Sequence, residues 1–260
     1  MMALWTTVSQ LRARVAGKIQ RLWWKVLTAI GVTRWFLTFA YRQLTRPDEI
    51  VLEGIKLAVR DDFWRSREPL YSEKYERSEL AILKDKLVAD DRVMELGTGL
   101  GLLSSFCAKR IGSSRVFTYE ANPALEDYIR QNYKLNDVNP HLELCLLAKE
   151  PGERSFYRGK NFYSSSTVRR YDSDTEIRVP VKSFNAEIRR IDPTFLIVDI
   201  EGGEVELFEF ADLYNVKKLL IELHDRVVGK EKIEAVKAIL TKAGFEILIA
   251  SGDELFLQRS

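Results

Sequence analysis

The sequence predicts an α/β protein built on a doubly wound, Rossmann-like sheet with helices on both faces. Apolar runs of strand length alternate along the chain with segments whose apolar residues recur at helical spacing. The apolar run Val93–Leu96 ends abruptly in glycines, and a helical pattern over residues 102–111 follows it. A second strand, over residues 115–119, ends in Glu120. Ligands of such sheets bind at the carboxyl ends of the strands, so we expect the functional site there.

Length and composition indicate one large domain with an appendage. The chain has 260 residues, of which 46% are hydrophobic and 30% charged, as in a soluble globular protein. We divide it into a helical N-terminal extension, residues 1–47, and a main domain, residues 48–260, that carries an insertion at residues 150–183. Its two cysteines, Cys107 and Cys145, lie in apolar stretches without metal-ligand spacing, which favours a reducing compartment such as the cytoplasm.

The N-terminal extension is basic, whereas the rest of the chain is acidic. Residues 1–47 contain eight lysines and arginines and no acidic residue, which leaves a net charge of −6 on residues 48–260. A main domain of that charge argues against a nucleic-acid partner. Four tryptophans among basic residues suit an amphipathic helix, through which residues 1–46 would contact anionic lipid at the inner face of a membrane. Packing on the domain or on a second subunit of a homo-oligomer is the alternative that stays open.

The remaining elements follow from the same periodicities. Two strands flank a polar loop in the insertion, which we interpret as a substrate loop or as a surface hairpin. The other predicted elements are one or two short strands in 49–60, helix 73–87, a helix beginning at Pro123, strand 142–148, helix 184–191, strands 195–199 and 216–222, helix 230–243, and closing strands 245–250 and 254–258.

The glycines after the first strand predict a nucleoside cofactor. Gly97, Gly99 and Gly101 form a strand-to-helix turn, where backbone without side chains lets a ligand approach closely. The third glycine of a dinucleotide fingerprint would stand at position 102, which is Leu102, and this disfavours a nicotinamide-dependent oxidoreductase. Glu120, at the end of the second strand, can accept hydrogen bonds from both ribose hydroxyls.

Four motifs resemble the FkbM family of class I S-adenosylmethionine-dependent methyltransferases. They are Glu95-Leu-Gly-Thr-Gly-Leu-Gly101, Glu120-Ala-Asn-Pro123, Asp199-Ile-Glu-Gly-Gly-Glu204 and Glu222-Leu-His224, within residues 70–230. The family often has Asp where Glu95 stands and Lys where Ile197 stands. The resemblance implies S-adenosylmethionine as cofactor and O-methylation of a hydroxyl on a saccharide or on a glycosylated or polyketide-type metabolite. The predicted cofactor-binding residues are Glu76, Glu95, Gly97, Thr98, Gly99, Gly101, Glu120, Ala121 and Asn122.

Three polar residues are the predicted catalytic group. Asp199 and Glu201 follow the fourth strand and His224 follows the fifth, so they should meet at one sheet edge and take the proton of the acceptor. A neutral imidazole suits this role, although a core histidine capped by a carboxylate is the alternative. A divalent metal held by Asp199, Glu201, Glu222 and Asp225 stays open as a competing mechanism. A catalytically silent scaffold attached to a membrane or partner is the alternative function.

Overall fold

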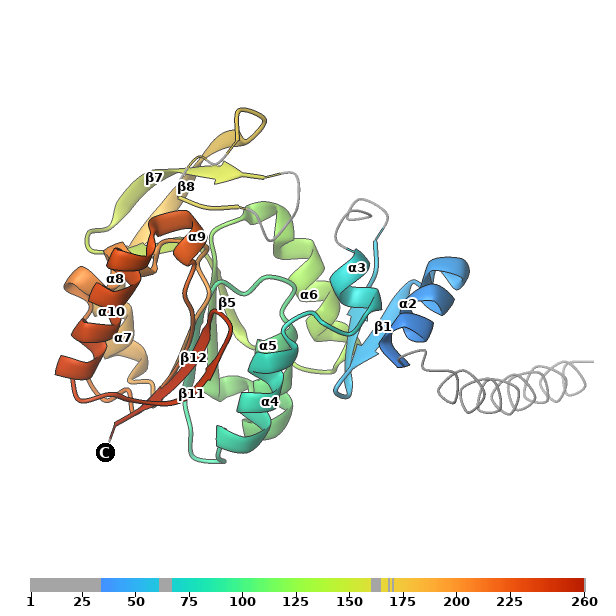
Figure 1. Ribbon diagram of the computed structural model, residues 1–260, viewed down its shortest axis with the longest axis horizontal. Helices are drawn as coiled ribbons and strands as arrows, with labels where there is room; N and C mark the ends of the chain where they lie inside the picture. Colours follow the sequence, from blue (N-terminus) through green and yellow to red (C-terminus); the bar gives the residue numbers. More distant parts are fainter. Residues whose placement is uncertain (1–33, 61–66, 160–164, 168, 170, 260) are drawn as a thin grey trace, which may run out of the picture. The chain divides into compact units, whose positions relative to one another are not determined.

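The computed structural model describes residues 34–60, 67–159, 165–167, 169 and 171–259 (Figure 1). They form two compact units, which are described separately. One unit comprises the described parts of residues 1–47 and 67–75, and the other those of residues 48–66 and 76–260. Most of the predicted N-terminal extension, residues 1–33, therefore lies outside the described part of the chain. No helix among the described residues is long and apolar enough to span a membrane.

The first unit consists of two helices joined by an arginine. Helix α2 (Arg34–Thr45) contacts the short helix α3 (Arg67–Tyr71). The guanidinium of Arg42 donates to the carbonyl oxygen of Tyr71 at 3.0 Å and forms an ion pair with Glu73 at 3.1 Å. Its charge therefore caps the C-terminal end of α3, where a cation is favoured.

The second unit is built on the predicted doubly wound sheet, so the expected fold class is confirmed. Five strands are parallel, and β12 runs antiparallel to both of its neighbours. The order across the sheet is β11 (Glu246–Ser251), β12 (Glu254–Gln258), β10 (Lys218–Glu222), β9 (Phe195–Val198), β3 (Val93–Leu96), β4 (Val116–Glu120) and β5 (His141–Leu144).

The central strands are apolar because both faces of the sheet are covered by helices (Figure 1). Every residue of β3 and β9 is buried, as in parallel sheets generally. One face carries α4 (Arg77–Lys86), α5 (Leu102–Ile111) and α6 (Glu126–Leu135), and the other carries α7 (Phe184–Ile191), α8 (Glu204–Phe210) and α10 (Lys230–Lys242). The shorter helices are η2 (Ser113–Arg115), η3 (Pro123–Leu125) and α9 (Asp225–Val228).

The strand order reverses between β3 and β9. The chain runs outward from β3 through β4 to β5 and then returns to place β9 on the other side of β3. The connections after β3 and β9 therefore leave the sheet in opposite directions and open a crevice at the carboxyl ends of these strands. The backbone N–H of Asp199 donates to the carbonyl oxygen of Leu96 at 2.9 Å and holds the two strand ends together at this point.

The predicted strand over residues 142–148 is wrong, because two strands occupy this stretch. Strand β5 ends at Leu144, which pairs with Glu120, the last residue of β4. Beyond it no further residue of β4 is available for pairing, and β6 (Leu146–Ala148) joins a separate sheet instead. That sheet has the order β6-β8-β7 and contains the predicted insertion strands as β7 (Gly152–Arg158) and β8 (Thr175–Ser183).

A hairpin of β1 (Glu49–Leu52) and β2 (Ile55–Ala58) precedes the sheet, in the stretch where one or two short strands were predicted. Asn132 of α6 and Asn136, directly after this helix, hold the hairpin in place. The Asn132 amide accepts from the backbone N–H of Ala58 at 2.8 Å and donates to the carbonyl oxygen of Leu100 at 2.8 Å. The Asn136 amide accepts from the backbone N–H of Lys56 at 2.9 Å and donates to the carbonyl oxygen of the same residue at 2.7 Å. Side chains thus supply the partners that the edge strand lacks.

Candidate active site

The loop after β3 carries its glycines in left-handed backbone conformations. Gly97 has φ +87°, and a Cβ at this position would lie 1.7 Å from the carbonyl oxygen of Asp199. A Cβ at Gly101, with φ +75°, would lie 2.9 Å from the Tyr133 ring. We expected the glycines to admit a ligand, but the structure shows that protein packing alone already requires two of them.

Glu120 holds this loop from the end of β4. Its carboxylate accepts hydrogen bonds from the backbone N–H groups of Gly99 at 3.0 Å and Asn122 at 2.7 Å. The backbone N–H groups of Thr98 and Ala121 also donate to this carboxylate. Burial raises the pKa of Glu120 to about 7, although these backbone hydrogen bonds lower it. The structure therefore brings together the predicted cofactor-binding residues at the ends of β3 and β4.

Two buried polar atoms near the loop lack hydrogen-bond partners among the described residues. They are the Oε2 atom of Glu95 and the Oγ1 atom of Thr98, and both residues are 1% exposed. Burial raises the pKa of Glu95 to about 8, while a hydrogen bond from Ser104 opposes this shift. Buried unpaired groups are costly, and the ammonium group of S-adenosylmethionine would supply a charged donor for a carboxylate. These residues therefore fit the expected cofactor.

Glu76 lies at the same end of the sheet but outside a helix. It precedes α4 in a left-handed conformation with φ 46°, so the helix begins at Arg77 rather than at residue 73 as predicted. Two residues further, the Ser78 hydroxyl donates to the carboxylate of Glu254, the first residue of β12. Because β12 is antiparallel, that residue lies beside the carboxyl end of β10, where Glu222 is its partner.

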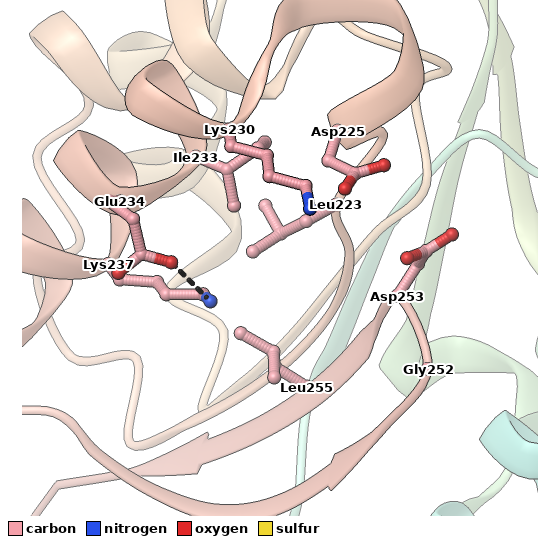
Figure 2. Close-up of a pocket in the computed structure, with 9 residues that line it drawn as sticks. All are labelled: Leu223, Asp225, Lys230, Ile233, Glu234, Lys237, Gly252, Asp253 and Leu255. Atoms are coloured by element: carbon pink, nitrogen blue, oxygen red, sulfur yellow. Dashed lines mark hydrogen bonds and ion pairs between the residues drawn. The ribbon is translucent and has the colours of Figure 1, made fainter.

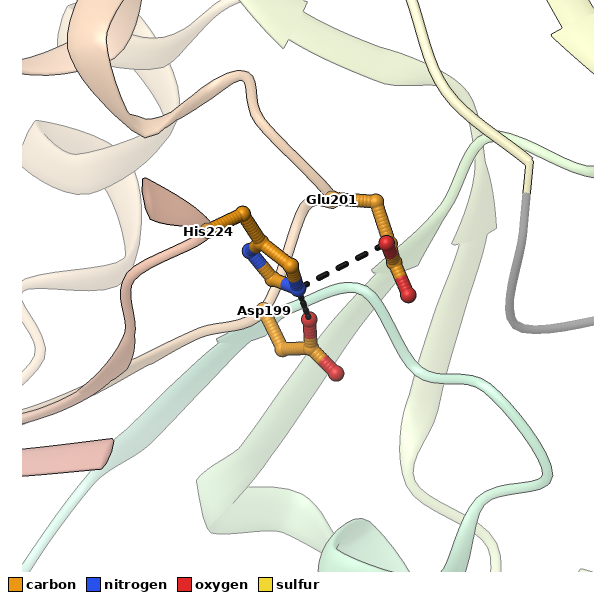
Figure 3. Close-up of side chains that lie close together, drawn as sticks. All are labelled: Asp199, Glu201 and His224. Carbon is orange, nitrogen blue, oxygen red and sulfur yellow. Dashed lines mark ion pairs between the residues drawn. The ribbon is translucent and has the colours of Figure 1, made fainter. Parts of the chain in front are cut away.

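Asp199, Glu201 and His224 meet at this edge, as predicted (Figure 3). One polar atom of each side chain lies within 4.8 Å of those of the other two. The Nε2 atom of His224 is 3.7 Å from Oδ1 of Asp199 and 3.5 Å from Oε2 of Glu201. Glu201 has φ 53°, a strained backbone conformation for a residue other than glycine. Glu222 is 3.8 Å from Nε2, and Asp225 lies outside the cluster.

Glu204 completes this cluster from the first turn of α8. It is fully buried, and its Oε1 atom lies 2.9 Å from Nδ1 of His224. Burial lowers the pKa of His224, but the bond to Glu204 and the charges of Glu201 and Glu222 outweigh it and raise the pKa. Burial and the nearby carboxylates also raise the pKa of Asp199. We expected a neutral imidazole, whereas these surroundings favour a positive charge at this position.

The insertion reaches both halves of the site. The Asn122 side-chain amide donates to the hydroxyl of Ser165 at 3.4 Å, and the Ser166 hydroxyl donates to the carbonyl oxygen of Glu201 at 2.8 Å. The backbone of Ser166 pairs with that of Tyr157 in β7. The two serines thus join the segments that follow β4 and β9. A polar loop was predicted here, but none of its residues was predicted to make these contacts.

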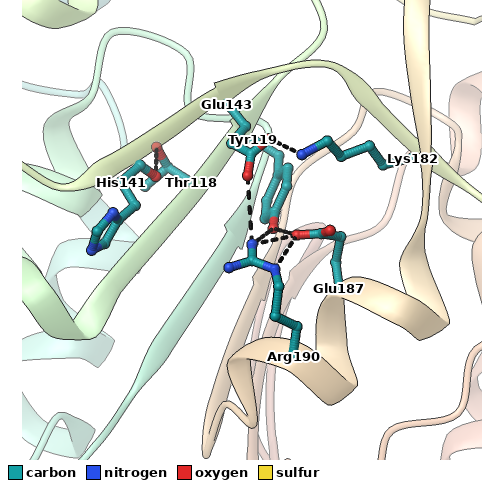
Figure 4. Close-up of polar contacts among 7 residues, drawn as sticks. All are labelled: Thr118, Tyr119, His141, Glu143, Lys182, Glu187 and Arg190. Atoms are coloured by element: carbon teal, nitrogen blue, oxygen red, sulfur yellow. Dashed lines mark hydrogen bonds and ion pairs between the residues drawn. The ribbon is translucent and has the colours of Figure 1, made fainter.

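A polar network fixes β4 directly before Glu120 (Figure 4). The Tyr119 hydroxyl donates to the carboxylate of Glu187 in α7 at 2.5 Å, and Arg190 contacts both groups. Lys182 of β8 forms an ion pair with Glu143 of β5, which also faces Arg190. The network links the main sheet to the insertion. His141, the first residue of β5, stacks on Phe117 with ring centroids 4.6 Å apart.

An open cavity of about 330 Å³ lies beyond the end of β10 (Figure 2). Its floor is apolar and its rim is charged. Leu223 and Asp225, the neighbours of His224 in the chain, are among the residues that line it. It is lined by Leu223, Asp225, Lys230, Ile233, Glu234, Lys237, Gly252, Asp253 and Leu255.

Comparison with known proteins gives matches in sequence and in structure. The family model described as "Methyltransferase FkbM domain" matches residues 96–247, more than half of the chain. A candidate protein N5-glutamine methyltransferase of Methanocaldococcus jannaschii is 37% identical over 93 residues, or 35% of this chain and 41% of the relative. An uncharacterised protein of the same archaeon is 32% identical over 166 residues, or 62% of this chain and 59% of the relative. The chain thus spans about half the length of these curated relatives.

Two solved structures are weakly similar. One is the ribosomal protein L11 methylase of Lactobacillus delbrueckii subsp. bulgaricus, with 13% identity, a TM-score of 0.45, and coverage of 72% of this chain and 79% of that one. The other is a tRNA (uracil-54, C5)-methyltransferase of Pyrococcus abyssi in complex with S-adenosyl-L-homocysteine. It has 14% identity, a TM-score of 0.46, and coverage of 81% of this chain and 43% of that one.

Proposed function

This chain belongs to the FkbM family of S-adenosylmethionine-dependent methyltransferases, and from that premise we propose that its acceptor is a hydroxyl oxygen. The proposed acceptor is a saccharide or a glycosylated or polyketide-type metabolite. The observation that carries the proposal is the cluster of Asp199, Glu201 and His224 beside the glycine loop. A hydroxyl loses its proton during methylation, so it needs a basic group within hydrogen-bond reach.

The residues of the chain have separate tasks in this reaction. Bound S-adenosylmethionine supplies a methyl group on a sulfonium, which is already activated for transfer. Glu120 accepts hydrogen bonds from the ribose hydroxyls while it keeps Gly99 in place. The carboxylates of the cluster orient the acceptor hydroxyl and receive its proton, and Glu204 fixes the His224 ring through Nδ1.

The cavity next to His224 supports an acceptor with both polar and apolar parts. Leu223, Ile233 and Leu255 offer an apolar floor, while Lys230 and Asp253 on the rim can bond hydroxyl groups (Figure 2). Binding sites of this kind combine an apolar lining with a few placed polar groups. A glycosylated metabolite has both kinds of surface.

The acceptor can be identified with labelled cofactor. The purified protein would be incubated with S-adenosylmethionine carrying a deuterated methyl group and with glycosides, glycosylated polyketides and peptides that contain glutamine. Mass spectrometry should find the label as a methyl ether on a hydroxyl. Label on an amide nitrogen would instead assign the chemistry that is named for the M. jannaschii relative. Cofactor binding without transfer to any acceptor would favour the silent scaffold.

Cofactor affinity should depend on pH through Glu120. The folded-state pKa of about 7 means that the carboxyl is protonated in mildly acidic solution and then cannot accept from both ribose hydroxyls. Glu120 should make S-adenosylhomocysteine bind more tightly as pH rises, by about tenfold per unit well below pH 7 and with no further gain from this group above it, while Glu95, with a pKa of about 8, adds its own gain up to that pH. The stability of the cofactor-free protein should depend on pH in the opposite direction. Because folding raises the pKa of the Glu120 carboxyl, the free energy of unfolding should fall as pH rises from 4.5 to 7.

Calorimetric titrations between pH 5.5 and pH 8.5 would measure the change in affinity, on the order of tenfold or more. Glu120→Gln is the matched variant, since it keeps the size of the side chain and removes its titration. Its affinity should be low and should keep only the pH dependence that Glu95 contributes near pH 8. If the affinity of this variant for S-adenosylhomocysteine still rose near pH 7 as in the wild type, the pH dependence would belong to another group.

We also propose that the basic extension places the enzyme at an anionic membrane. Residues 1–33 lie outside the described structure, but their composition and helix α2 support the idea. The side chains of Phe36, Tyr41 and Leu44 on α2 are 50%, 55% and 86% exposed. Exposed apolar groups among basic residues suit the interface of a bilayer, where each cation contributes about 1 kcal/mol.

Sedimentation with vesicles that contain anionic lipid would test this placement. The full chain should sediment at low salt and be released at high salt, and deletion of residues 1–33 should weaken binding while it retains the bonds of Arg42 to α3. Failure of the full chain to sediment at low salt would contradict the proposal. A large loss of thermal stability on deletion would then favour packing of the extension on the protein.

A further inference from the structure

We propose that Asp199, Glu201 and His224 bind a divalent cation of the Mg²⁺ or Mn²⁺ type. The inference deepens the proposed function and rests on it for the role of the ion, which would contact the acceptor hydroxyl and favour loss of its proton. Binding of the ion can be measured without any acceptor.

The distances between the three side chains suit ligands that share an ion. Their separations from Nε2 of His224, 3.7 Å to Asp199 and 3.5 Å to Glu201, are longer than hydrogen bonds. Ligands at about 2.0–2.2 Å from one metal ion lie about 3–4 Å from each other at adjacent positions. Both carboxylates therefore lie on the Nε2 side of the imidazole ring, as Figure 3 shows.

The histidine is held as metal-binding histidines are. Its Nδ1 atom faces the fully buried carboxylate of Glu204 at 2.9 Å, and Nε2 points towards Asp199 and Glu201. Glu204 is itself fixed, because the backbone N–H of Gly202 donates to the same oxygen at 3.2 Å. A carboxylate behind the imidazole orients the ring and makes the other nitrogen a better ligand.

The cluster also carries an excess of negative charge. Oδ1 of Asp199 is buried and has no hydrogen-bond partner among the described residues. In the described part of the chain, neither Asp199 nor Glu204 nor Glu222 forms an ion pair with a lysine or arginine. One imidazole therefore faces several carboxylates, and a divalent cation would balance them. Two carboxylate oxygens and one imidazole nitrogen form a donor set that Mn²⁺ accepts, and Mg²⁺ takes the oxygens with water.

The test uses the full chain after treatment with a chelator and dialysis. Free Mn²⁺ would be followed by its electron paramagnetic resonance signal, and Mg²⁺ by competition. One ion should bind per chain, and Asp199→Asn, Glu201→Gln and His224→Gln should each weaken binding at least tenfold. Glu204→Gln should weaken it by about tenfold to a hundredfold as a positioning residue. Asp225→Asn is the matched control, since it follows His224 in the chain but lies outside the cluster.

The outcomes separate this inference from the proposed function. Absence of a stoichiometric ion, or unchanged binding by folded Asp199→Asn and Glu201→Gln, would overturn the metal site. Circular dichroism identifies variants that fail to fold, and Asp199→Asn, at 35% side-chain exposure against 21% for Glu201, is the variant whose fold should be least affected. Methyl transfer to a hydroxyl in excess chelator would support the function and overturn the role of the ion. Tight Mn²⁺ binding with label on nitrogen would keep the site and overturn the proposed acceptor.

Discussion

Gly97→Ala is expected to abolish binding of S-adenosylhomocysteine and to destabilise the protein strongly. The new Cβ would lie 1.7 Å from the carbonyl oxygen of Asp199, so β3 and β9 must separate at the point where the crevice opens. The left-handed conformation, φ +87°, adds a further cost. Together these effects should lower the free energy of unfolding by about 2–4 kcal/mol. Urea denaturation would measure this loss, and calorimetric titration would measure the loss of binding.

Gly112→Ala separates the steric effect from the backbone effect. Gly112 has φ +90°, but no atom lies within 4 Å of the position that its Cβ would take. This variant should lose only about 1 kcal/mol and should bind S-adenosylhomocysteine normally. Equal losses in the two variants would mean that the contact with Asp199 is unimportant, and normal binding by Gly97→Ala would contradict the geometry of the loop.

Asp199→Asn should lower the rate of methyl transfer by about a hundredfold to ten-thousandfold, with little effect on cofactor affinity. The substitution keeps the shape of the side chain and its backbone carbonyl, which faces Gly97, but removes a negative charge that faces His224. Single-turnover transfer of a labelled methyl group would measure the rate, and calorimetry would measure the affinity.

The same assays on Asp225→Asn provide the comparison. This carboxylate lines the cavity next to His224 but lies outside the cluster, so its removal should leave the rate at saturating acceptor nearly unchanged and alter only the acceptor concentration that is needed. A wild-type rate in Asp199→Asn would remove this residue from the reaction. A parallel loss of cofactor affinity would place it in the cofactor site instead.

Much of the fold could be predicted because the sheet is buried on both faces. Strand β9 is a continuous apolar run that ends before Asp199, and β3 is apolar except for Glu95 and ends in glycines; such segments are distinct in sequence. The break at Cys145 could not be predicted, since Leu142 to Ala148 remains apolar enough for one strand. It depends on where β4 ends, which is a property of the partner strand. The start of α4 was misplaced because Glu76 adopts a left-handed conformation that is uncommon for glutamate.

The site was predicted in part for a related reason. Parallel strands bring their carboxyl ends to one edge, so Asp199, Glu201 and His224 could be placed together from sequence. Glu204 was missed as a site residue, although an acidic residue at the start of a helix beside a predicted base was a usable signal. Ser165 and Ser166 could not have been found, because their contacts with Asn122 and Glu201 join segments far apart in the chain.

The two serine contacts have a consequence for the kinetics of the enzyme. Ser165 contacts the segment after β4 that should bind the cofactor, and Ser166 contacts the backbone of Glu201 on the acceptor side. A movement of this segment that admits one substrate therefore also changes access to the other. We expect an obligatory order of addition rather than random order, with the cofactor entering first and its demethylated product leaving last. S-adenosylhomocysteine should then inhibit competitively against S-adenosylmethionine and noncompetitively against the acceptor.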